Sequence, residues 1–115
     1  MPQDSVVFGH IRQECEQLIF NVCNKIFGPK EYNQTQVATL ISQTNEESVK
    51  QLLNNNKNFK YMVVTTAMQK KGTAAADHLE MTADCYWNAS TDGQSCVRWE
   101  NDHMFVFVTL FACAL

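Results

Sequence analysis

The chain has 115 residues, of which 45% are hydrophobic and 18% charged, and its formal net charge is -3. This length fits one domain with a modest core, and the lack of a basic excess argues against a nucleic-acid-binding protein. No apolar run approaches the roughly 18 residues that span a bilayer, and the first residues lack the pattern of a signal peptide. Five irregularly spaced cysteines indicate reduced thiols. We therefore expect a single cytosolic domain over residues 1–115 that binds neither nucleic acid nor membrane.

Two amphipathic helices are predicted in the first half of the chain. Apolar residues recur at spacings of three and four over about 6–27, where a glycine-proline pair ends the pattern. A second helix is expected over about 34–54, with Asn33 as its N-cap and Gln36 as the capping-box partner. The apolar stripe of this second helix is predicted to comprise Val37, Leu40, Ile41, Val49, Leu52 and Leu53.

The second half of the chain is rich in β-branched and aromatic residues, and its period becomes that of strands. Four strands are predicted, over about 59–69, 81–89, 95–101 and 103–113. Two helices followed by four strands predict an α+β fold in which both helices pack on a four-stranded antiparallel sheet.

The distribution of apolar residues differs between the four predicted strands. The first and last strands are apolar on both faces, as in central strands, whereas the middle two alternate, as in edge strands. Two helices cover only one face of such a sheet, so the other face would expose apolar side chains. That face would carry Met62, Val64, Met68, Phe105, Phe107 and Phe111, or their neighbours of opposite parity. Because so large an apolar patch is uncommon on a monomer, a homodimer is expected.

Catalytic and metal sites find little support in the sequence. Cys85, Cys96, His78 and His103 are the candidate zinc ligands, but they lack the spacing of a zinc site, and the two cysteines lie in strand patterns. A thiol enzyme with His103 as the base remains an alternative, although no sequence feature marks a cleft. The four glycines are isolated, which excludes a glycine-rich phosphate loop. We expect no enzyme, no metal and no cofactor.

The segment "STDGQSCVRWEN" places a cation beside a tryptophan. Neighbouring residues of a strand point to opposite faces, so Trp99 is predicted to join the core while Arg98 points away from it. Three roles stay open for Arg98: a surface ion pair, a dimer contact or a peptide contact.

Three blocks of the second half together resemble one family. "FKYMVVTTAMQKKG", "DCYWNASTDGQSCVRWEN" and "MFVFVTLFA" follow one another over residues 59–112. They are similar to the blocks of the Tctex-type dynein light chains, in which an FKY strand precedes a turn with S-T-D-G and a VRWEN strand. The VRWEN ending favours the cytoplasmic-type branch over the second Tctex branch. The helical half agrees with the family in layout more than in sequence.

The resemblance implies a strand-exchanged homodimer in which the second strand crosses to the sheet of the partner. Members of the family bind a segment of the dynein intermediate chain by adding a strand beside the exchanged one. On this chain the implied partner-binding edge is Met81, Thr82, Ala83, Asp84, Cys85, Tyr86 and Trp87. Residues expected in the dimer interface or sheet core are Phe59, Tyr61, Val63, Val97, Trp99, Phe105 and Phe107, with Arg98 as a surface contact.

The expected function is therefore that of a non-catalytic dynein light chain. Its partners would be a second copy or a related Tctex-type light chain, the dynein intermediate chain and, indirectly, the dynein heavy chain and microtubules. A motor-independent dimeric adaptor that uses the same groove is the first alternative, ahead of the small thiol enzyme. The cytoplasm and cytoskeleton are the expected location, with a ciliary or flagellar axoneme as the alternative.

Overall fold

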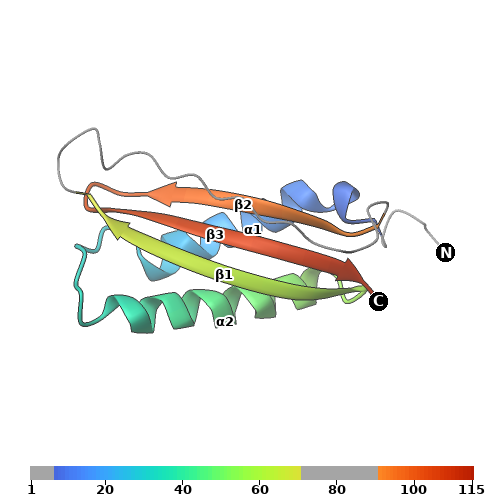
Figure 1. Ribbon diagram of the computed structural model, residues 1–115, viewed down its shortest axis with the longest axis horizontal. Helices are drawn as coiled ribbons and strands as arrows, with labels where there is room; N and C mark the ends of the chain where they lie inside the picture. Colours follow the sequence, from blue (N-terminus) through green and yellow to red (C-terminus); the bar gives the residue numbers. More distant parts are fainter. Residues whose placement is uncertain (1–6, 71–90) are drawn as a thin grey trace.

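The computed structural model describes residues 7–70 and 91–115, so the predicted strand over 81–89 lies outside the described residues. Figure 1 shows two long helices and a sheet of three long strands. The elements are the 3-10 turn η2 (Phe8–His10), helices α1 (Arg12–Ile26) and α2 (Val37–Asn55), and strands β1 (Phe59–Gln69), β2 (Gly93–Glu100) and β3 (Met104–Ala114).

The three described strands form one antiparallel sheet in the order β1-β3-β2. β3 lies in the centre, as predicted from its two apolar faces, and β2 lies at an edge, as predicted from its alternation. β1, also predicted to be central, lies at the other edge of the described sheet. The register across the sheet follows from the two partners of Val108, which pairs with Val97 of β2 on one side and with Thr65 of β1 on the other. The prediction of an α+β fold with two helices and an antiparallel sheet is thus confirmed.

Both helices pack on one face of this sheet, and the core lies between the two layers. α1 lies against β2 and α2 against β1 (Figure 1). Along β2 the odd-numbered residues are buried and Cys96, Arg98 and Glu100 are exposed, which is the alternation of a strand with one covered face. The largest fully buried apolar side chains are Phe8, Phe27, Phe59, Ile19, Leu52, Met104, Leu110, Val106 and Val108.

The buried line of α2 differs from the predicted apolar stripe. Thr44, Ser48 and Leu52 are buried at intervals of four residues, whereas Leu53 is 41% exposed. The Thr44 hydroxyl donates a hydrogen bond to the carbonyl of Leu40 at 2.8 Å, so this polar side chain can be buried without an unsatisfied donor.

The start of α2 also differs from the prediction. The Asn33 carboxamide oxygen accepts hydrogen bonds from the backbone N–H and the hydroxyl of Thr35. This turn precedes the helix, which begins at Val37, and the helix N-cap Gln36 makes no side-chain capping bond. Asn33 therefore organises the turn before α2, and the helix begins about one turn later than predicted.

Three hydrogen bonds align α1 with β2 along their whole lengths. The Arg12 guanidinium donates to the carbonyl of Gln94 at 2.6 Å, and the Ser95 hydroxyl donates to the carboxylate of Glu16. At the other end, the indole N–H of Trp99 donates to the side-chain oxygen of Asn24 at 2.8 Å. The two elements therefore run side by side in the same direction.

Gly93, at the start of β2, has no room for a side chain, because an added Cβ would overlap the Cδ2 atom of Phe8. We expect Gly93→Ala to lower the free energy of unfolding by about 1–3 kcal/mol, since inserting a methyl group into a packed core forces its neighbours apart. Urea denaturation measures this change. Gly9→Ala is the matched control, because no atom lies within 4 Å of its added Cβ. Equal unfolding midpoints for the two variants would contradict the conclusion that Phe8 leaves no room for a side chain at Gly93.

Candidate functional site: the open face of the sheet

The face of the sheet that turns away from the helices carries apolar side chains in rows across the three strands. The pairing places Met62, Phe111 and Gln94 in one row, followed by Val64, Thr109 and Cys96, then Thr66, Phe107 and Arg98, and finally Met68, Phe105 and Glu100. Met62 is 62% exposed and Val64 is 45% exposed. The predicted apolar face is thus exposed along β1, whereas Phe105 and Thr109 of β3 are buried. We call these four rows the open face.

The structure separates the residues that the sequence assigned to the dimer or sheet core into two sets. Phe59, Val97 and Trp99 are buried between the sheet and the helices, and Tyr61 and Val63 pack at the margin of that core. Phe105 and Phe107 lie on the open face, with their rings stacked at a centroid distance of 6.4 Å. The predicted partner-binding residues Met81 to Trp87 lie outside the described residues.

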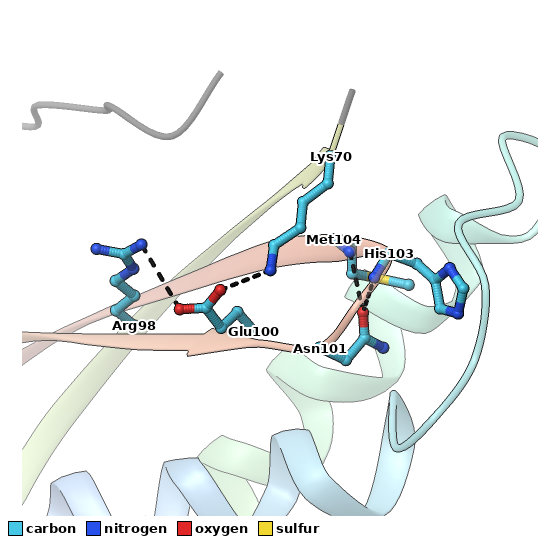
Figure 2. A network of polar contacts seen from close by, with 6 residues as sticks. All are labelled: Lys70, Arg98, Glu100, Asn101, His103 and Met104. Carbon is cyan, nitrogen blue, oxygen red and sulfur yellow. Dashed lines mark hydrogen bonds and ion pairs between the residues drawn. The ribbon is translucent and has the colours of Figure 1, made fainter. Parts of the chain in front are cut away.

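A charged cluster closes one end of the open face, where Figure 2 shows Glu100 between two cations. The Lys70 ammonium donates to one oxygen of Glu100 at 2.6 Å, and the Arg98 guanidinium lies 3.6 Å from the other oxygen. Both cations also lie over the ring of Phe105, at 4.7 Å and 5.0 Å from its centroid. The hydrogen bond from Lys70 holds the pKa of the Glu100 carboxyl below its usual value, so Glu100 stays ionised at neutral pH.

Of the three roles left open for Arg98, the ion pair is the one made within the described residues. Its guanidinium pairs with Glu100 and its side chain remains 52% exposed. Trp99, the next residue, is 4% exposed and packs against Phe27 at a centroid distance of 5.7 Å. The two neighbours thus lie on opposite faces, as predicted from strand geometry.

Two asparagines that the sequence did not single out fix this end of the sheet. Asn24 accepts the indole N–H of Trp99. Asn101, in the β2–β3 turn, accepts the backbone N–H groups of His103 and Met104 at 2.8 Å and 2.9 Å (Figure 2). Its amide nitrogen also donates to the carbonyls of Gly28 and Lys30 at 3.0 Å. The turn residues Asn101 and Asp102 indicate a turn from sequence alone, but the contact with the segment after α1 requires the fold.

The two buried thiols of α1, those of Cys15 and Cys23, lack an environment that would activate a nucleophile. Burial raises the pKa of Cys15 to about 11 and that of Cys23 to about 12, so both remain protonated at neutral pH. Cys96 is exposed on the open face. Within residues 7–70 and 91–115, no group of three or more His, Cys, Asp or Glu side chains could hold a metal ion. In the same residues, no helix combines the length and apolar character that crossing a membrane would require.

The outer edges of the sheet carry backbone groups that no described strand pairs with. On β1, the backbone N–H of Lys70 donates to the carbonyl of His103 at 2.9 Å, which shows that even-numbered residues pair with β3. Because pairing alternates along an antiparallel strand, the N–H and C=O groups of Tyr61, Val63, Thr65 and Ala67 point outward. The β1 edge thus presents a row of donors and acceptors beside the exposed Met62 and Val64.

These features define a small α+β domain in which two helices cover one face of the sheet, and the other face joins apolar rows to a β1 edge that no described strand pairs with. The chain belongs to the Tctex-1 family, whose sequence model matches residues 11–113. The resemblance that the three sequence blocks indicate is thereby confirmed.

Named relatives agree with this assignment. The chain is 32% identical over 111 residues to a Drosophila melanogaster protein named dynein light chain Tctex-type. The matched region covers 90% of this chain and 96% of the relative. It is 27% identical over 107 residues to the human dynein light chain Tctex-type 3, with coverage of 93% and 89%. A Dictyostelium discoideum dynein light chain Tctex-type is 29% identical over 85 residues, or 73% of each chain.

Proposed function

We propose that this protein is a non-catalytic dynein light chain. It forms a homodimer, or pairs with a related Tctex-type light chain, and binds dynein intermediate chains by β-strand addition. Membership of the Tctex-1 family and the names of the relatives support this proposal. Through the intermediate chain it would associate with the heavy chain and microtubules, in the cytoplasm and cytoskeleton or in an axoneme.

The observation that carries the proposal is the open face beside the outer edge of β1. An apolar edge strand of this length, 11 residues, is an aggregation hazard unless another chain covers it. A strand from a second copy that pairs with β1 would satisfy the outward backbone groups of Tyr61 to Ala67. The same partner would cover Met62 and Val64, so one contact would remove both the unpaired edge and the exposed apolar surface.

Strand addition also explains how such a dimer would bind an unfolded partner. The exchanged strand would itself become the new edge, on which an extended segment gains main-chain hydrogen bonds and side-chain pockets select its sequence. Two identical grooves on one dimer would hold two intermediate chains, and the second contact would gain from effective concentration. The dimer would thus pair two chains of one motor.

The test uses side chains of the predicted binding strand and leaves its backbone intact. We expect Asp84→Lys and Tyr86→Ala to weaken binding of an intermediate-chain segment by about 1 kcal/mol or more, the usual threshold for an important contact. Isothermal titration calorimetry measures the affinity, and light scattering checks that the variants stay dimeric.

Arg98→Ala is the matched control for this test, because Arg98 lies on β2 at the opposite edge of the described sheet. A larger loss of affinity with Arg98→Ala than with the strand variants would place the groove on β2 and contradict the proposal. Purification of tagged protein separates the alternatives: dynein chains support the light chain, whereas unrelated clients alone would support the motor-independent adaptor.

A further inference from the structure

The outer edge of β2 and the flank of α1 enclose a groove that the proposed intermediate-chain site does not use. We propose that this groove is a second docking site, which binds an extended peptide segment carrying basic residues on both sides of an apolar one. The site lies along the β2 edge of the sheet, on the side opposite the β1 edge. It is independent of the proposed pairing with dynein.

The groove consists of two hollows that share Phe20, whose side chain is 39% exposed. The first, of about 450 Å³, lies between the α1 residues Gln13, Glu16, Gln17 and Phe20 and the β2 residues Cys96 and Val97. The second, of about 500 Å³, continues past Phe20 to Trp99 and the β2–β3 turn. Since α1 and β2 run side by side, the two hollows follow one line.

The backbone of β2 offers hydrogen bonds along this line. Asn101 donates its N–H to the carbonyl of Met104 at 3.1 Å, so odd-numbered residues of β2 pair with β3 and even-numbered ones point outward. The bond from Arg12 agrees with this outward direction of the even-numbered residues, because its guanidinium donates to the carbonyl of Gln94. Arg12 therefore already occupies the first outward carbonyl of β2. The N–H and C=O groups of Cys96, Arg98 and Glu100 remain for an added strand, and no described strand pairs with them.

The charges of the residues that line the groove indicate which kind of peptide would bind there. The residues that line the two hollows include the carboxylates Glu16 and Asp102, and also Glu100, which Lys70 and Arg98 already neutralise; the lining itself contains neither lysine nor arginine. Glu16 lies in the hollow on one side of Phe20, and Asp102 lies in the hollow on the other. A segment with cations at two positions around an apolar residue therefore matches the groove, whereas an acidic segment is repelled.

The spacing of the α1 side chains fits a strand. Glu16 and Phe20 are four residues apart on a helix, which corresponds to about 6 Å along its axis. Side chains on one face of a strand recur every two residues, or about 6.6 Å. Alternate residues of an added strand thus meet Glu16 and Phe20 in turn, and the pattern basic-x-apolar-x-basic reads the same in either strand direction.

The experiment titrates the full-length, isotope-labelled protein with a peptide whose centre is Lys-Thr-Val-Thr-Lys and follows the amide resonances by NMR. We expect saturable shifts at the amides of Cys96, Arg98 and Glu100. A peptide with Glu-Thr-Val-Thr-Glu should bind at least fivefold more weakly. Methylation of the threonine nitrogens should abolish binding of an antiparallel added strand, and methylation of the valine nitrogen that of a parallel one, because these are the main-chain donors that point toward β2 in the two directions.

Variants of two similarly exposed apolar residues identify the groove. Phe20→Ala should weaken the basic peptide at least fivefold, while Leu53→Ala, on α2 and 41% exposed, should leave its affinity unchanged. Preference for the acidic peptide, shifts confined to β1, equal effects of the two variants, or no saturation at millimolar peptide would each overturn the proposal. Shifts at β2 caused by concentrating the protein alone, and lost in Phe20→Ala, would assign the groove to a second copy instead.

Discussion

Trp99→Ala is expected to lower the free energy of unfolding by about 3–5 kcal/mol, as truncation of a buried aromatic side chain does. Trp99 is 4% exposed and packs on Phe27. Its loss would leave a cavity between β2 and α1 and would remove the hydrogen-bond donor of Asn24. Urea or thermal denaturation of the purified variant measures the change.

Two further substitutions separate the contributions to this effect. Trp99→Phe keeps much of the ring volume and loses only the indole N–H, so a smaller destabilisation is expected. Arg98→Ala, one residue earlier, removes an exposed ion pair and should change the stability by no more than about 1 kcal/mol. Comparable destabilisation by Arg98→Ala and Trp99→Ala would refute the assignment of the two residues to opposite faces.

Val64→Glu is expected to dissociate the proposed homodimer. Val64 lies on β1, at the edge of the open face, and is 45% exposed, and a carboxylate there would have to be buried without a partner in the interface. Light scattering at micromolar concentration should give the mass of a 13.1 kDa monomer for the variant and twice that mass for the unmodified protein.

Leu53→Glu provides the control, because it places the same charge on an equally exposed apolar residue of α2, away from the open face. This variant should remain dimeric. If the unmodified, folded protein is already a monomer, or if the two glutamate variants behave alike, the open face is not the dimer interface.

Much of the strand half of the fold was predictable, because the pattern of apolar residues along a strand indicates which of its two faces are covered. Alternation in β2 fixed which side chains turn inward, and the two apolar faces of β3 marked it as central. The helical half was less predictable, since a helix buries whichever line of residues the sheet admits. In α2 this line includes Thr44 and Ser48, whose small polar side chains interrupt the apolar periodicity that a sequence displays.

The sequence predicted that one face of the sheet would expose apolar side chains, but it did not predict which residues lie on that face. Sequence left undecided whether Met62 and Val64 or their neighbours faced outward, because both sets are apolar. The pairing of β1 with β3 decides between them. The contacts of Asn24 and Asn101 could not be predicted, since each joins segments more than 70 residues apart. The partner-binding strand over 81–87 stays a prediction.

The position of β3 in the sheet has a consequence for how the chain acquires its fold during synthesis. β1 and β2 pair with β3 and not with each other, yet β3 is the latest of the three strands in the sequence. Until residues 104–114 leave the ribosome, neither earlier strand has its described neighbour, and Phe59 lacks the sheet that completes its core. The pairing of β1 with β3 is non-local and therefore slow, whereas β2 and β3 form a local hairpin. The apolar side chains of β1 thus wait longest for a neighbour, until the central strand is synthesised.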